Sequence, residues 1–367
     1  MPRADAPPAK PSVVVLGAGV SGLSVALALL KRGDTVTVLE RGEAGAESSW
    51  AGGGILSPLL PWNYPDALTA LALRSMAAYP DWVADIEARA GRSTEYTRSG
   101  MRVLGEPHPE TAVAWCRAHG LAAMPRHDEA GDAVWLPEIA QVRNPRLVSA
   151  LRDAVVGLGG TLRTHESATA VVTRAAKVEA VHTANADYAA DRFVVATGAW
   201  AGIPLPGLPA VPNIRPIRGQ MLLFQLSPGA LDTILYRRGL YLIPRRDGHV
   251  LVGSTLEDVG FDKATDAATR ARLHAEAAEL LPVLRSLQPV RHWAGLRPGA
   301  PDNIPVIDRH PDFDNVFVNV GHYRYGVTLA PASAELLADL LEGRAPALDP
   351  APYRWQAALQ RSWPQGQ

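Results

Sequence analysis

The sequence predicts an α/β fold, α+β overall, in which a domain with a parallel sheet is braided with a domain built on an antiparallel sheet. Near the N-terminus a short apolar run, a glycine-rich turn, an amphipathic run and a second apolar run follow one another. The middle of the chain is instead rich in short strand patterns separated by turn residues. Strand and helix patterns of the first kind return toward the C-terminus, so we expect the chain to cross between two domains.

The N-terminal unit carries a glycine motif. Val13–Leu16 is an apolar run typical of a buried strand, and Leu23–Lys31 is an amphipathic run typical of a helix. Between them Gly17, Gly19 and Gly22 stand in G-x-G-x-x-G spacing. The first glycine allows a sharp turn, the second lets a pyrophosphate approach the backbone, and the third lets the helix pack on the strand. Because a helix N-terminus presents free N–H groups to phosphates, the pattern predicts a Rossmann-type domain.

The residues after this helix favour dinucleotide binding over a purely structural turn. Gly33 ends the helix, and Thr35–Leu39 reads as a second strand. Glu40 follows it, roughly 20 residues after the glycine motif, where an acid can accept hydrogen bonds from a ribose diol. An isolated glycine motif often only connects two elements, but here strand, turn, helix, strand and acid stand in order.

Length, composition and charge exclude several classes of protein. The 367 residues are 47% hydrophobic and 20% charged, which suggests about two joined globular domains. A net charge of −1 gives no sign of binding to nucleic acid or to an anionic membrane. The longest apolar runs, such as residues 25–30, are far shorter than the roughly 20 residues of a membrane span.

Cysteine usage and the N-terminus bear on location. Cys116 is the single cysteine, so the chain has no internal disulfide and no multi-cysteine metal site, and we expect a cytoplasmic protein. Residues 1–11, rich in proline and alanine, read as a disordered tail rather than a secretory signal. No histidine stands at metal-ligand spacing with an acid cluster, so no metal is expected.

The remaining patterns divide the chain between the two domains. Residues 12–90, 141–210 and 292–367 are assigned to the cofactor-binding domain, and residues 91–140 and 211–291 to the substrate-binding domain. Antiparallel strands are expected over residues 219–226, 240–244 and 249–253, with a hairpin turn at residues 246–248. Glycine and proline make residues 295–305 read as an irregular loop, and residues 321–328 read as a loop before the last long helix.

Several segments together resemble the D-amino acid oxidase superfamily of flavoproteins, within it the glycine oxidase (ThiO) branch. They span nearly the whole chain in the family's order, and the last three are the most specific. The segments are Val15–Gly22, Ser48–Leu56, Arg218–Met221, Gly253–Asp258, Gly295–Pro298 and Gly321–Gly326.

The resemblance implies FAD as the cofactor. Glu40 would hold the adenosine ribose, Ser48 and Ser49 the pyrophosphate, and Val171 the adenine side through its backbone. Relatives with covalent flavin use a Cys or His tether, and the residues around Trp50 are Ala and Gly, so non-covalent FAD is expected. The positions placed at the cofactor are Gly17, Gly19, Val20, Ser21, Gly22, Glu40, Arg41, Ser48, Ser49, Gly53, Gly54, Ile55, Val171, Thr197, Gly198, Trp200, His322, Tyr323, Arg324, Tyr325, Gly326, Val327 and Thr328.

The resemblance also implies a carboxylate site. Arg297 matches the family's carboxylate-binding arginine, and a guanidinium clamps a carboxylate bidentately. Tyr241 matches the tyrosine that donates to the same carboxylate, and Ile55 would line the substrate and the flavin. Arg324 would lie near the flavin C2=O. By composition alone, a loop arginine usually makes a surface ion pair and a strand tyrosine is usually core.

The function implied is oxidation of a small amino acid by hydride transfer to flavin N5. Dioxygen would then become hydrogen peroxide, and the imine would hydrolyse to an oxo acid and ammonia. Glycine, sarcosine, D-proline and other small D-amino acids stay open as substrates, because Gly239 and Tyr325 depart from the family's pattern. A role in thiamine biosynthesis and a homo-oligomer are expected. The alternatives are a D-amino acid dehydrogenase that reduces a quinone or carrier, and a non-catalytic FAD-binding protein.

Overall fold

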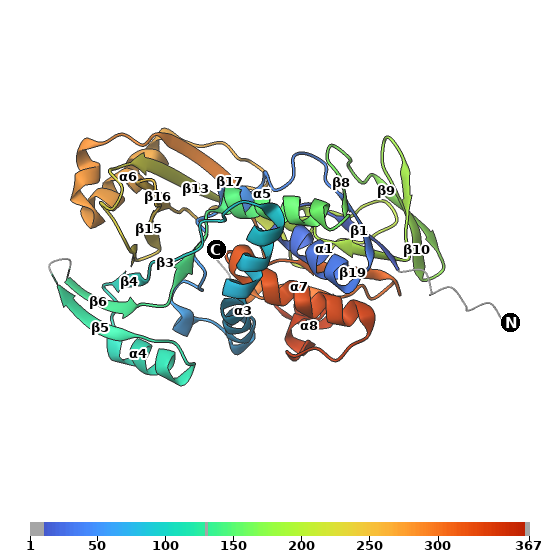
Figure 1. Cartoon of the computed structure of the whole chain (residues 1–367), viewed down its shortest axis with the longest axis horizontal. Coiled ribbons are helices and arrows are strands. Elements are labelled where there is room, and N and C mark those ends of the chain that lie inside the picture. Colours follow the sequence, from blue (N-terminus) through green and yellow to red (C-terminus); the bar gives the residue numbers. More distant parts are fainter. Residues whose placement is uncertain (1–10, 129–130, 364–367) are drawn as a thin grey trace.

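The computed structural model describes residues 11–128 and 131–363, which form two large sheets with helices packed between and around them (Figure 1). Of the expected N-terminal tail, residues 1–10 lie outside the described residues. Pro11 is described, and its carbonyl oxygen accepts a hydrogen bond from the Thr35 backbone N–H (3.0 Å). The mixed α/β class predicted from the sequence is confirmed.

The first sheet is the predicted Rossmann-type sheet. It has six strands in the order β18-β19-β12-β1-β2-β8, and every pair except β18–β19 is parallel. Its central strands are almost wholly apolar, as expected for a parallel sheet covered on both faces. The strands are β1 (Ser12–Leu16), β2 (Thr35–Leu39), β8 (Thr161–Arg163), β12 (Arg192–Val195), β18 (Val306–Arg309) and β19 (Val316–Val320).

Different elements cover the two faces of this sheet. One face packs against α1 (Val20–Arg32), α5 (Asn144–Gly157) and α7 (Gly326–Glu342), and α3 (Asp66–Ala90) packs on α5 and α7 in the same hydrophobic core. The other face packs against a three-stranded sheet and α8 (Trp355–Gln360). The three strands are β9 (Ala170–Arg174), β10 (Lys177–His182) and β11 (Asp187–Ala189), which form an antiparallel meander.

The second sheet has eight strands in the order β17-β13-β16-β15-β14-β4-β6-β5. One face packs on α6 (Ala267–Leu280), seen at one end of the molecule in Figure 1, and α4 (Pro109–Ala118) packs on β5 and β6. A 3-10 helix, Pro282–Ser286, follows α6. The strands are β4 (Met101–Leu104), β5 (Met124–Asp128), β6 (Gly131–Leu136), β13 (Arg215–Gln225), β14 (Ile234–Arg237), β15 (Leu240–Pro244), β16 (His249–Gly253) and β17 (Arg291–Gly299).

The expectation of an irregular loop over residues 295–305 is wrong for residues 295–299, whereas residues 300–305 contain one 3-10 helix and otherwise irregular backbone. Residues 291–299 form β17, which pairs antiparallel with β13 over nine consecutive residue pairs, from Arg215–Gly299 to Leu223–Arg291. Because β17 lies at the edge of the sheet, Pro298 costs no ladder hydrogen bond on the outer side. β17 therefore belongs with the eight-stranded sheet, although the expected boundary at residue 292 would assign it to the other domain. The rest of the domain division stays a prediction.

Several shorter elements complete the fold. Residues 48–51 form a short helix, α2 (Ser48–Ala51). α7 begins inside the loop expected over residues 321–328. Residues 97–104 form two strands in different sheets, because β3 (Thr97–Arg98) pairs with β7 (Ala140–Gln141) while β4 joins the large sheet. Further 3-10 helices are Pro61–Asn63, Gly198–Trp200, Pro301–Asn303 and Ala351–Tyr353.

Candidate active site

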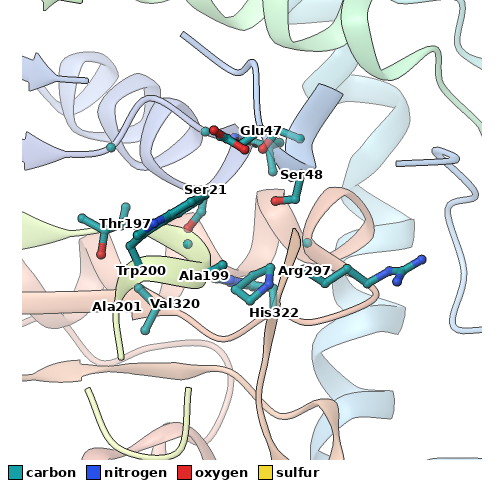
Figure 2. A pocket seen from close by; sticks show the side chains of 18 of the residues that line it. Ser21, Glu47, Ser48, Thr197, Ala199, Trp200, Ala201, Arg297, Val320 and His322 are labelled. Carbon is teal, nitrogen blue, oxygen red and sulfur yellow. Dashed lines mark hydrogen bonds between the residues drawn. The ribbon is translucent and has the colours of Figure 1, made fainter. Parts of the chain in front are cut away.

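An elongated cavity runs from the carboxyl ends of the parallel strands to the eight-stranded sheet. Its empty volume is about 2130 Å³, space open to solvent included. Figure 2 shows Thr197 and Trp200 at one end and the Arg297 side chain extending away from them at the other. A position outside the carboxyl ends of parallel strands is where open α/β sheets bind their ligands.

The glycine motif has the geometry that the sequence predicts. Gly17 has a φ of +103°, and a Cβ on Gly22 would lie well under 3.0 Å from the Gly17 carbonyl oxygen. Gly19 begins α1 and lines the cavity, while Ser49 Oγ accepts the Val20 N–H (2.9 Å). Gly22 thus serves helix packing and does not line the cavity, although it was expected at the cofactor. Gly17 and Gly19 have no side chains and line the cavity with backbone alone, which leaves room for a phosphate to approach.

Glu40 is fixed at the end of β2. Its Oε2 accepts the Ala18 N–H (2.9 Å) and its Oε1 accepts the Gly42 N–H (3.0 Å). The carboxylate is partly exposed and lines the cavity, so its remaining lone pairs can accept hydrogen bonds from a ligand's hydroxyls. Beside it the Arg41 guanidinium lies 3.5 Å from the centroid of the Trp200 ring and forms part of the same wall.

The segment Gly52–Ile55 is held rigidly between the two sheets. Arg245 Nη2 donates to the Gly53 carbonyl (2.7 Å), and the Val142 N–H donates to the Gly54 carbonyl (2.9 Å). Gly54 has a φ of +76°, and a Cβ there would lie under 3.0 Å from the Val142 carbonyl oxygen. The Ile55 carbonyl accepts the Thr328 hydroxyl (2.9 Å). These contacts leave Gly53, Gly54 and Ile55 lining the cavity.

The N-terminus of α7 also faces the cavity. Residues His322–Thr328 all line it, and the first turn of α7 contributes the partial positive charge of a helix N-terminus. His322 is buried, and this burial lowers the pKa of its imidazole to about 4. The imidazole is therefore neutral at neutral pH and can either donate or accept a hydrogen bond.

The substrate end is built on one face of the eight-stranded sheet. Side chains alternate between faces along a strand, and residues paired across strands share a face. Trp293, Gly295 and Arg297 of β17 therefore project to the same side. The register carries this face across the sheet through Met221, Gly253, Tyr241 and Tyr236. The opposite face carries the leucines and valines that pack on α6.

The Arg297 guanidinium is anchored by the segment that follows β16. Nη2 donates to Ser254 Oγ (2.7 Å) and Nη1 donates to the Thr255 carbonyl (3.1 Å). Burial lowers the pKa of Arg297 from its usual value, while the nearby Tyr241 hydroxyl opposes this shift. A guanidinium has five N–H donors, so donors remain for a ligand. Within the described chain no carboxylate forms an ion pair with Arg297, which suits a site for an anionic substrate.

Arg324 lies among tyrosines at this end. Burial lowers the pKa of Arg324, but Tyr325, Tyr64 and Tyr241 outweigh it, so the pKa is raised overall. The Tyr64 and Tyr325 hydroxyls are hydrogen-bonded to each other, and the Tyr325 hydroxyl also accepts the Leu59 N–H (3.2 Å). The departure from the family pattern at Tyr325 thus places a bulky, firmly held side chain beside the substrate end.

The structure brings most of the predicted residues to one cavity, but not all. Val171 does not line it, because this residue lies in β9 and its N–H donates to the Pro206 carbonyl (2.9 Å). Asn319 and Glu166 also line the cavity, although no motif in the sequence predicts them there. An asparagine inside the apolar run of β19 was the signal available for Asn319. For Glu166 the sequence held no comparable signal.

Buried polar groups test whether the cavity fits FAD. Both amide atoms of Asn319, the Nε2 of His322 and the Oε1 of Glu166 have no hydrogen-bond partner within the described chain. All three residues line the cavity at points along its length. Buried polar atoms normally have partners, so this wall fits a long polar ligand. Together with the glycine turn and Glu40, the residues present fit an adenine dinucleotide.

Comparison with known proteins decides the family. The family described as "DAO: FAD dependent oxidoreductase" matches residues 12–340. The chain belongs to the family of FAD-dependent oxidoreductases. Its cofactor is therefore FAD, as the resemblance implied. Cys116 is buried in α4 and does not line the cavity, in agreement with non-covalent binding.

Several individual proteins that are similar to this chain are named glycine oxidase. The chain is 43% identical to the glycine oxidase of Pseudomonas aeruginosa, covering 93% of this chain and 97% of that protein. It is 43% identical to the glycine oxidase of Pseudomonas putida, covering 95% of this chain and 99% of that protein. Among solved structures, glycine oxidase from Geobacillus kaustophilus matches with a TM-score of 0.86 at 27% identity, covering 94% of this chain and 99% of that one.

Residues 11–128 and 131–363 contain no group of three His, Cys, Asp or Glu side chains able to hold a metal ion. Over the same ranges, no helix combines the length and apolarity needed to cross a membrane.

Proposed function

We propose that this member of the family is a glycine oxidase, which oxidises glycine or a closely similar small amine with FAD and dioxygen. The observation that carries the proposal is that Arg297 and Tyr241 lie on the same face of the eight-stranded sheet, at the end of the cofactor cavity. The Pseudomonas relatives named glycine oxidase, which match over almost their whole length, support the same activity.

The chain's own residues bind and orient the substrate. The Arg297 guanidinium and the Tyr241 hydroxyl hold the carboxylate, so the α-carbon is directed toward the segment Gly53–Ile55. Bound FAD would supply the redox chemistry, namely the two-electron oxidation of the amine at the α-carbon and the reduction of dioxygen to hydrogen peroxide. The N-terminus of α7 and Arg324 add positive charge beside the position where negative charge develops.

The pocket's walls favour small substrates. The Tyr241 ring is closely enclosed, because a Cβ on Gly53 would lie 3.2 Å from Tyr241 Cε2 and a Cβ on Gly253 would lie 3.0 Å from the same atom. The hydrogen-bonded pair of Tyr64 and Tyr325 adds a second fixed wall. Glycine therefore fits the site better than amino acids with large side chains.

A substrate panel tests the proposal. Purified protein loaded with FAD is mixed with glycine, sarcosine, D-proline and D-alanine, and peroxide is measured in air. Parallel samples under nitrogen receive a quinone or a redox dye. Peroxide from glycine supports the oxidase, and dye reduction without peroxide would indicate the dehydrogenase. A flavin that no amine bleaches under nitrogen would indicate a non-catalytic FAD-binding protein.

The cellular location, the oligomeric state and the pathway of this protein are also proposals. A cytoplasmic homo-oligomer remains our expectation, and sedimentation and cell fractionation test it. The proposed link to thiamine biosynthesis is supported by relatives named "Bifunctional protein ThiO/ThiG", of which this chain is 34% identical to the one from Synechocystis and spans 51% of it. Growth of a thiamine-requiring strain that lacks its own glycine oxidase would test the link.

A further inference from the structure

We propose that Gly219 is a positioning residue for the substrate carboxylate, because the Arg297 guanidinium lies directly against its backbone. This inference rests on the proposed function, since it assumes that Arg297 binds the carboxylate. In the sequence Gly219 belongs to a strand and has no evident role. The structure gives it one through its position relative to β17.

The strand register places Gly219 under the arginine. Gly219 pairs with Gly295, and Ile217 pairs with Arg297, so Gly219 is the diagonal neighbour of Arg297 on the same face. A Cβ built on Gly219 would lie under 3.0 Å from Arg297 Nη1, Nη2 and Cζ, closer than real Cβ contacts. The guanidinium thus occupies the space that any side chain at position 219 would need.

The strand beneath the guanidinium is fixed. β13 lies between β17 and β16, and both neighbours hydrogen-bond to it. Arg218 exchanges two backbone hydrogen bonds with Glu257 (2.9 and 3.0 Å), and the Gln220 N–H donates to Thr255 Oγ1 (2.9 Å). Backbone on both sides of Gly219 is therefore tied down, so a methyl group at position 219 moves the flexible end of Arg297 rather than the sheet.

Displacement of the guanidinium has a specific consequence. Arg297 is held by Ser254 Oγ and the Thr255 carbonyl, and these bonds set the direction of its remaining donors. Bidentate binding of a carboxylate depends on that direction. A shift of about 1 Å in such a group can cost on the order of a hundredfold in a reaction that depends on it. Gly219→Ala should therefore weaken carboxylate binding while the fold and FAD binding persist.

The experiment is a double-mutant cycle on the FAD-loaded protein with Gly219→Ala, Arg297→Met and the double variant. Met ends before Cζ, so it removes all three guanidinium atoms that the new methyl group would meet. Acetate, a carboxylate without the amine, is titrated by calorimetry, and KM and kcat are measured with glycine. Thermal unfolding and the flavin spectrum are recorded for each protein. Gly157→Ala is the control, since a Cβ there has its nearest neighbour at 4.0 Å.

The expected result is a rise of about tenfold or more in the acetate Kd and the glycine KM of Gly219→Ala, with a smaller change in kcat. In the Arg297→Met background the same substitution should change neither stability nor acetate binding further. If Arg297→Met weakens acetate binding but Gly219→Ala does not, the inference about Gly219 is wrong and the proposed function stands.

If neither variant weakens acetate binding, the carboxylate does not bind at Arg297, and both proposals are wrong. If Gly219→Ala alone does not fold, the double variant decides. Folding of the double variant supports the contact between the methyl group and the guanidinium, and its failure to fold overturns the inference.

Discussion

Arg297 keeps its positive charge in a partly buried position where the described chain offers it a hydroxyl and a carbonyl, not a carboxylate. An anionic ligand that binds there supplies the opposite charge that the guanidinium lacks, so its binding is strongly favoured. Arg297→Met should therefore raise the glycine KM by an amount equivalent to about 2–5 kcal/mol, the usual effect of removing one partner of a desolvated charge pair. Steady-state kinetics and acetate titration measure the change.

The matched control is Arg309→Met. Arg309 pairs with Asp314 at 3.1 Å on the surface, where ion pairs contribute little, so its kinetics should match those of the unchanged enzyme. A normal KM in Arg297→Met would remove the carboxylate assignment altogether.

Glu40 lines the cavity at the end opposite to Arg297. Glu40→Gln keeps one acceptor oxygen but turns an amide N–H₂ toward a backbone N–H, either that of Ala18 or that of Gly42. A hydrogen bond to a charged group contributes about 1.5–3 kcal/mol, so the FAD Kd should rise about tenfold or more. Fluorescence titration of FAD into the FAD-free protein measures it, and Glu179→Gln on β10 is the control. An unchanged Kd would mean that Glu40 supports only the turn.

At the scale of elements, the sequence located the Rossmann-type unit because local patterns determine it. Apolar strands, the glycine spacing and the glycine that ends α1 are all short-range signals. β17 was missed because Gly295, Pro298 and Gly299 read as turn residues. The reason for these residues is tertiary: a Cβ on Gly295 would lie under 3.0 Å from the Ala51 Cβ of α2, and Pro298 lies in an edge strand.

The site residues also divide into those that a local motif predicts and those that only the folded chain reveals. Arg297 and Tyr241 were found through motifs, but their common face depends on a register that no local pattern specifies. Asn319 and Glu166 contribute through burial beside a cavity, which only the folded chain reveals.

Arg245 shows how one side chain joins two elements. It donates to Gln141 Oε1 (2.7 Å), to the Val142 carbonyl (3.0 Å) and to the Gly53 carbonyl (2.7 Å). The side chain is therefore held by acceptors within the protein rather than solvated. Burial lowers the pKa of Arg245 to about 10, and the side chain stays charged at neutral pH.

Arg245→Met should leave these acceptors without a donor, at about 1–3 kcal/mol for each one that stays buried. We expect a lower melting temperature and, because Gly53 lines the cavity, a weaker affinity for FAD. Differential scanning calorimetry and FAD titration provide the two measurements. Arg246→Met is the matched control, since that neighbouring side chain is exposed and, among the described residues, bonds only to residues 96 and 97. Equal effects in the two variants would contradict the assigned role.

At the scale of the whole molecule, buried histidines make stability depend on pH. Burial lowers the pKa of His322 to about 4, below its ordinary value of 6.5, and it lowers the pKa of His292 and His310 as well. Between these pH values the unfolded chain binds more protons than the folded one, so stability should fall as pH falls from about 6.5 toward 4.

His322→Gln should reduce this slope without removing it, because the other two histidines share it. Urea unfolding of the FAD-loaded protein at several pH values measures the slope. The control is His127→Gln, since this histidine lies on the surface, away from the cavity. An unaltered slope in His322→Gln would show that His322 binds protons equally in the folded and the unfolded chain, which would contradict its lowered pKa.

The cavity also links the two sheets through their common ligand. The six-stranded sheet supplies Glu40 and the ends of its parallel strands, while the eight-stranded sheet supplies Arg297, Tyr241 and, through Arg245, the position of Gly53. A ligand that binds only the folded state stabilises it by about 1.4 kcal/mol for each tenfold rise in free concentration above its Kd.

If both sheets must be folded to hold FAD, unfolding should be a single transition whose midpoint temperature rises with the FAD concentration. Calorimetry at increasing FAD tests this, with Arg297→Met expected to show the same rise, since its side chain serves the substrate. Two transitions, with only one dependent on FAD, would mean that the eight-stranded sheet unfolds independently of the cofactor.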